Sequence, residues 1–241
     1  MKIKRIMAAL VLLGSVGSAW SVAAVSTPNV VYIEQTGSSN TVTVEQIGST
    51  NAVGSDGNWS RIVGNSNTVA VRQVGNNNTG SYTIAGGVNT YTGSIAGSSN
   101  TTTVTIGENG AGVVLRNTVD HRITGSFNTV ATTVVGNDIT GTVDITGNLN
   151  AIVTALRSSQ GSSAVTVGGN SNTVDVEQLD VAGSSGHRMM LALSGDWNSV
   201  VVQQQGTVDT VADIRITGSN NTVTVRSSNS ALIMPRTAIA K

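Results

Sequence analysis

The chain has 241 residues, 13 basic and 13 acidic side chains, a formal net charge of zero and no cysteine. The sparse, balanced charge argues against nucleic-acid or anionic-lipid binding, and the lack of cysteine excludes disulfides, thiolate catalysis and cysteine-based metal sites. Aromatic residues make up 3% of the chain, too few for a conventional packed core, whereas strand-forming and turn-forming residues are abundant.

The first 24 residues have the features of a secretory signal. Three basic residues within the first five positions precede an apolar run over residues 6–13, and small residues end at Ala24. This pattern predicts a signal peptide over residues 1–24 that is cleaved after Ala24. The apolar run is shorter than the roughly 20 residues of a spanning helix, so we expect a secreted chain with no membrane span after cleavage.

The segment 34–53 contains the same pattern twice, eleven residues apart. Each copy has a glutamine, a glycine two positions later, an asparagine three after that and a valine two beyond. The copies are Gln35, Gly37, Asn40 and Val42, followed by Gln46, Gly48, Asn51 and Val53. Apolar residues alternate with polar ones between the copies, which is typical of a strand, and each Gly-x-x-Asn tetrad is typical of a turn.

The pattern recurs almost to the end of the chain. The predicted turn glycines are Gly37, Gly48, Gly64, Gly75, Gly125, Gly136, Gly147, Gly169, Gly206 and Gly218. The predicted repeat amides are Gln35, Asn40, Gln46, Asn51, Asn67, Gln73, Asn78, Asn172, Gln178, Asn198 and Gln204. Interruptions are expected near Asp56, over 109–114 and over 187–193, and the glutamines are missing between 80 and 160. A fixed period over most of a chain indicates stacked repeats.

An eleven-residue unit cannot bury its apolar face alone, so the units must stack. Two units per rung predict an all-β fold, a β-solenoid of strand-turn-strand repeats with about 22 residues per rung. It should occupy residues 25–229 in roughly nine or ten rungs, about 45 Å long, with residues 230–241 as a tail or cap. The valines would form apolar columns, and the asparagines and glutamines would form amide ladders from rung to rung.

At these residues the chain resembles the curlin family, the secreted subunits of bacterial curli fibres. The similarity is specific over residues 30–78 and fair over 170–206. It implies a β-solenoid subunit that is exported through an outer-membrane channel and polymerises at the cell surface for adhesion and biofilm cohesion. The implied partners are further copies of the chain, or a related curlin subunit, and the curli-type secretion machinery.

No residue pattern indicates catalysis, a metal site or a cofactor. His121 and His187 are the only histidines, lack a ligand spacing, and are expected to be solvated turn residues. No Gly-x-Ser-x-Gly nucleophile motif is present. Trp59 and Trp197 each follow a turn, and packing over the corner of a rung is favoured over contact with sugars or abiotic surfaces.

Two classes of function remain. The first is a structural fibre subunit, favoured because the repeat over residues 30–44 begins close to the mature terminus without a protective cap. The alternative is a monomeric secreted β-solenoid adhesin that binds a carbohydrate or ice along a flat face. Ice binding requires a regular Thr-x-Thr array, which Thr41 and Thr43 fit and Val69-Ala70-Val71 interrupts. We therefore predict the fibre subunit.

Overall fold

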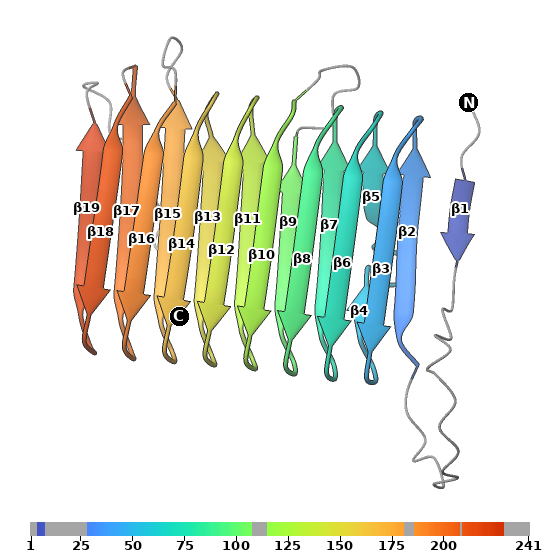
Figure 1. Cartoon of the computed structure of the whole chain (residues 1–241), viewed down its shortest axis with the longest axis horizontal. Helices are drawn as coiled ribbons and strands as arrows, with labels where there is room; N and C mark the ends of the chain where they lie inside the picture. Colours follow the sequence, from blue (N-terminus) through green and yellow to red (C-terminus); the bar gives the residue numbers. More distant parts are fainter. Residues whose placement is uncertain (1–3, 8–27, 108–114, 181–185, 208, 229–241) are drawn as a thin grey trace, which may run out of the picture.

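The computed structural model describes residues 4–7, 28–107, 115–180, 186–207 and 209–228. Within these ranges there is no helix, and consequently none long and apolar enough to cross a membrane. Nearly all the strands belong to one continuous coil that alternates between two parallel sheets (Figure 1). The predicted β-solenoid is confirmed.

The two sheets, here called sheet A and sheet B, form the opposite faces of the coil. Sheet A contains β2 (Val30–Thr36), β4 (Ala52–Val53), β5 (Ser60–Val63), β7 (Thr79–Ala85), β9 (Thr101–Ile106), β11 (Thr129–Val135), β13 (Ala151–Arg157), β15 (Thr173–Asp180), β17 (Ser199–Gly206) and β19 (Thr222–Ser228). Sheet B contains β3 (Thr41–Ile47), β6 (Thr68–Val74), β8 (Thr90–Ala96), β10 (Thr118–Thr124), β12 (Thr140–Thr146), β14 (Ser162–Gly168), β16 (Arg188–Ser194) and β18 (Val211–Thr217).

Pairing between rungs is parallel and in register throughout both sheets. Thr118 of β10, for example, lies between Thr90 of β8 and Thr140 of β12. Equivalent residues are 22 positions apart in uninterrupted rungs, 27, 28 or 26 apart across the three interrupted ones, and 23 apart at the last step, from Asn198 to Asn221. Equivalent side chains therefore lie one strand spacing apart, about 4.8 Å, along the length of the stack.

The third interruption lies earlier than the sequence predicts. The sequence places it over residues 187–193, but Arg188–Ser194 forms β16, in register with β14. Met189, Leu191 and Leu193 alternate and point into the core, where each is buried. The extra residues instead lie between β15 and β16, and the second predicted interruption, 109–114, lies outside the described residues.

The first interruption divides one strand of sheet A. Residues 54–59 separate β4 from β5, and both short strands pair with β2 and β7. Trp59, at the end of this insertion, contacts Tyr32 edge-on with ring centroids 5.6 Å apart. The insertion therefore leaves the stack continuous.

Inward-facing side chains form the core, and the glutamine-free middle is as well buried as the ends. Ile95, Ile123 and Ile145 occupy the glutamine position of successive rungs in sheet B and are fully buried. An isoleucine fills the same inward position as a glutamine, so loss of the amide does not interrupt the stack.

The two edges of the solenoid differ. Every described turn from sheet B to sheet A has four residues with the pattern Gly-x-x-Asn. We call this side of the solenoid the regular edge. It is the uniform lower edge in Figure 1. The turns from sheet A to sheet B, the irregular edge, vary in sequence and length. The connections between β9 and β10 and between β15 and β16 are longer than four residues.

The predicted terminal segments lie almost wholly outside the described residues. Residues 4–7, within the predicted signal peptide, form β1 (Lys4–Met7), which pairs antiparallel with the outer side of β2. The rest of residues 1–24 and the predicted tail over 230–241 are not described, so cleavage and capping remain predictions.

Candidate functional site

Asparagines form a continuous column along the regular edge, one immediately before each strand of sheet A apart from the split partner β5. This regular column consists of Asn29, Asn51, Asn78, Asn100, Asn128, Asn150, Asn172, Asn198 and Asn221. From Asn51 to Asn198 no member is more than 1% exposed. A buried amide is stable only when all its polar groups are paired, so its contacts decide its role.

Asn128 illustrates the geometry. Its backbone N–H and its Nδ2 donate to Oδ1 of Asn100 at 3.0 and 3.1 Å, and Nδ2 also donates to the carbonyl of Gly147 at 2.8 Å. Its own Oδ1 accepts from the backbone N–H and Nδ2 of Asn150 at 3.0 and 3.1 Å. Every polar atom of the side chain is thus paired, and all members from Asn78 to Asn221 donate in the same direction along the stack.

The turn geometry explains why asparagine recurs with glycine. A Cβ on Gly147 would overlap the carbonyl oxygen of Gly169 in the next rung, and the φ of Gly147 is +138°. Only glycine combines that backbone conformation with so close an approach. The carbonyl groups exposed by this approach are the ones to which the asparagine Nδ2 groups donate.

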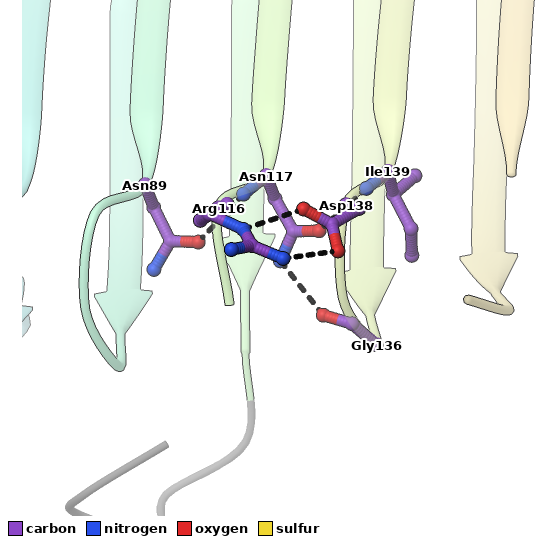
Figure 2. A network of polar contacts seen from close by, with 6 residues as sticks. All are labelled: Asn89, Arg116, Asn117, Gly136, Asp138 and Ile139. Atoms are coloured by element: carbon purple, nitrogen blue, oxygen red, sulfur yellow. Dashed lines mark hydrogen bonds and ion pairs between the residues drawn. The ribbon is translucent and has the colours of Figure 1, made fainter. Parts of the chain in front are cut away.

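The irregular edge has a shorter column. Asn40, Asn67, Asn89 and Asn117 form the same type of contact, and Figure 2 shows its end at Ile139, whose N–H donates to Asn117 Oδ1 at 2.9 Å. Isoleucine has no side-chain amide that could accept from the next rung, so the column ends there.

An exposed ion pair lies beside the end of this column. Arg116 Nε and Nη2 each donate to Asp138 at 2.7 Å, and these hydrogen bonds hold the pKa of the Asp138 carboxyl below its ordinary value (Figure 2).

The glutamines form two separate pairs, which corrects the expectation of glutamine ladders. Gln46 Nε2 donates to Gln73 Oε1 at 2.8 Å in sheet B, and Gln178 Nε2 donates to Gln204 Oε1 at 2.9 Å in sheet A. Gln35 is only half-buried and donates to the carbonyl of Asn40 at 3.4 Å. Apolar residues occupy the equivalent positions between the pairs, so an amide chain cannot continue through the core.

Nine of the ten predicted turn glycines have positive φ. These are Gly37, Gly48, Gly64, Gly75, Gly125, Gly136, Gly147, Gly169 and Gly218. Gly206 differs because it is the last residue of β17, paired with Asp180, and is not among the positive-φ residues. The prediction of Gly206 as a turn glycine is therefore wrong.

The expectation of solvated histidines is also wrong. His121 lies in β10, fully buried, with Nε2 2.9 Å from Thr132 Oγ1 and its ring edge-on to Tyr91 at 5.5 Å. Burial lowers the pKa of His121 from 6.5 to about 4. Alternation along β10 places His121 inward between Val119 and Ile123, which the spacing of the strand could have revealed.

His187 takes an asparagine position on the irregular edge. Its Nδ1 accepts from the backbone N–H of Thr210 at 3.2 Å, as an asparagine Oδ1 does in a complete column, and Nε2 lies 3.3 Å from the carbonyl of Leu179. These partners assign the proton to Nε2.

The tryptophans have different environments. Trp59 is half-buried against Tyr32, whereas Trp197 is 67% exposed at a turn on the regular edge. Packing over a rung corner is therefore wrong for Trp197. Within the described ranges no three histidine, aspartate or glutamate side chains gather as metal ligands.

Both ends of the stack leave the core incompletely covered. Val31, Val42 and Val44 pack against the core at one end, as Val223 and Val225 do at the other, but all are only partly buried. Among the described strands, β1 and β19 in sheet A and β3 and β18 in sheet B each pair on one side only. Asn221 Oδ1 accepts no hydrogen bond from any described residue, so within the described part of the chain the regular column ends at this acceptor.

Comparison with known families identifies one match. The curlin associated repeat matches residues 28–48, which contain β2, β3 and the turn between them. The match supports the resemblance to the curlin family that the repeat amides predicted. No curated protein and no solved structure matches the chain.

Proposed function

We propose that this protein is a secreted structural subunit that assembles end to end into curli-like amyloid fibres at the cell surface, for adhesion and biofilm matrix. The curlin repeat and the β-solenoid fit a curli-like structural subunit, and point to a structural protein rather than an enzyme. The observation on which the proposal rests is the regular column, which passes through every rung and ends with an acceptor at Asn221.

The residues at the two ends are compatible with continued stacking. In a head-to-tail junction, Asn221 Oδ1 would accept from Asn29 of the next copy, and Val223 and Val225 would stack on Val31 and Ile33. This repeats the contacts made inside the molecule between neighbouring rungs. Sheet A has one level more than sheet B among the described residues, so a continuous junction needs one further sheet B strand from beyond Ser228 or from a partner.

Export follows from the predicted signal peptide, and curli-type secretion machinery is the proposed export partner. Cleavage after Ala24 would remove β1 and leave the outer side of β2 without this partner. Maturation would thereby produce an end able to pair with another copy or with a related curlin subunit.

The alternative of an ice-binding face finds no support in the outward rows of sheet B. Thr41, Thr68, Thr90, Thr118 and Thr140 stack in one row. The row two residues along each strand, however, includes Ala70 and Asp120 between its threonines. The paired threonine rows that a flat ice-binding surface requires are therefore incomplete.

Refolding of the mature chain tests the proposal. We expect thioflavin-positive fibres after a lag that preformed seeds shorten, and fibre diffraction with a meridional reflection at about 4.8 Å. A chain that stays monomeric at high concentration, with or without seeds, would contradict fibre assembly and favour the adhesin.

A further inference from the structure

Three large apolar side chains project from successive turns of the regular edge. Phe127 and Leu149 are each 60% exposed, and Trp197 is 67% exposed. They follow β10, β12 and β16, and Ser171 after β14 occupies the equivalent position between Leu149 and Trp197. We call these four positions the tip ridge. Its order along the stack is large, large, small, large.

Large apolar side chains at these turn positions cost free energy unless a partner surface covers them. Phe127, Leu149 and Trp197 have φ of 59°, 59° and 60°, a region that costs a non-glycine residue roughly 1 kcal/mol and that asparagine tolerates best. Equivalent turns of the same edge contain small or polar residues, Thr50, Asn77, Ser99 and Asn220. Bulky apolar residues on three of four neighbouring rungs thus add backbone strain and exposed apolar surface.

The ridge is held on a rigid base. The backbone N–H of Asn148 donates to Asn170 Oδ1 at 2.9 Å, and that of Asn170 donates to Asp196 Oδ1 at 2.6 Å. These bonds join the turns directly below the tips. Phe127 and Trp197 are therefore three rung spacings apart, about 14 Å.

We propose that the tip ridge is a lateral contact with a second copy of this chain, arranged antiparallel about a two-fold axis. In this arrangement Leu149 lies against the partner's Ser171, which provides the gap it needs, and Phe127 lies against the partner's Trp197. Such a contact is self-complementary, as two-fold interfaces are. A parallel arrangement would oppose Leu149 to itself and leave the gap at Ser171 unfilled.

Charge favours the same orientation. Asp196 is the only charged residue in the two central positions of these four turns. The antiparallel contact places the two copies of Asp196 at opposite ends, about 14 Å apart, beyond the screening length of about 8 Å at physiological salt. A parallel contact would place them side by side.

The size of the ridge determines when the contact forms. Three side chains bury far less than the roughly 1,200 Å² of a stable interface, so two single molecules would associate weakly. In a fibre the ridge recurs once per subunit, and many weak contacts act together. The inference thus rests on the proposed function, and the contact pairs neighbouring fibres.

Replacing the ridge with asparagine tests the surface. The triple variant Phe127→Asn, Leu149→Asn and Trp197→Asn introduces a residue already present at Asn77 and Asn220, so the fold should be retained. We expect normal thioflavin kinetics but single fibres in electron micrographs where the wild-type chain forms paired ones. The matched control is Val88→Asn, an exposed tip with φ of 62° on the irregular edge, which should pair normally. Paired triple-variant fibres would overturn the inference, as would wild-type pairing that requires added polysaccharide.

Cross-linking tests the orientation, because the chain has no native cysteine. Isotope-labelled Leu149→Cys is mixed with unlabelled Ser171→Cys, and the fibres are oxidised. Antiparallel pairing predicts disulfides mainly between the two variants, and a majority of disulfides within either variant would contradict it. Failure of the wild-type chain to form any fibre counts against the proposed function. In that case the ridge inference fails too, unless the mixed disulfide still forms between soluble chains.

Discussion

Asn128 stabilises the fold mainly because its side chain pairs buried polar groups of the neighbouring rungs. Asn128→Ala leaves the Asn150 backbone N–H and the Gly147 carbonyl without these partners, and it removes one of the two acceptors of Asn150 Nδ2, which keeps the carbonyl of Gly169. Each buried unpaired group costs about 1–3 kcal/mol, so we expect a loss of about 3 kcal/mol or more in the free energy of unfolding. Urea denaturation of the soluble chain measures it. Thr129→Ala, at an exposed neighbouring position, should change the free energy of unfolding by less than about 0.5 kcal/mol. Equal effects of the two substitutions would contradict the stabilising role of Asn128 in the regular column.

His121 should make the fold sensitive to acid. Its pKa is about 4 in the folded chain and near 6.5 when unfolded, so the unfolded chain binds the extra proton between these values. Stability should therefore fall as pH decreases from 6.5 towards 4, by about 3 kcal/mol from this residue. Denaturation at pH 7.5 and 4.5, compared with His121→Leu, isolates the effect. The variant should lose less stability on acidification, and an identical loss would show that His121 is not buried and neutral.

At the scale of the turn, two adjacent glycines offer a matched pair. Gly169 has φ of +119° and a Cβ added to it would overlap the carbonyl oxygen of Gly195, whereas the nearest atom to a Cβ on Gly168 is 3.8 Å away. We expect Gly169→Ala to destabilise by several kcal/mol or to prevent folding, because both conformation and contact oppose it. Gly168→Ala should fold normally. Thermal unfolding monitored by circular dichroism distinguishes them, and comparable melting temperatures would contradict the close approach of the rungs.

The features that can be predicted best from the sequence are the residues that every rung must repeat. Asn51 and Gly48 were predictable because each turn imposes the same backbone and the same hydrogen bonds. The glutamine positions were less predictable from sequence, because isoleucine can occupy the same inward position without a side-chain amide. The exposure of Trp197 depends on the direction of a turn, which residue type does not determine. The alternation of Met189, Leu191 and Leu193 was visible in the sequence, but the neighbouring insertion obscured its register.

At the scale of the molecule, the ends should control growth. Val42 is partly buried at the open side of β3, and Thr43 points outward on the same strand. Val42→Glu would place a carboxylate within a head-to-tail junction without a partner, so we expect elongation to slow about tenfold or more. Thr43→Glu adds the same charge outside the junction and should elongate normally. Seeded thioflavin kinetics measure both, and equal rates would indicate that growth does not use this end.

The central claim is that the regular column continues from one molecule into the next. Fibres grown from a mixture of ¹⁵N-labelled and ¹³C-labelled chains allow contacts between molecules to be selected by solid-state NMR. We predict an intermolecular correlation between the side chains of Asn221 and Asn29, lost in Asn29→Ala. Well-ordered fibres in which Asn221 correlates only with residues of its own chain would contradict the claim.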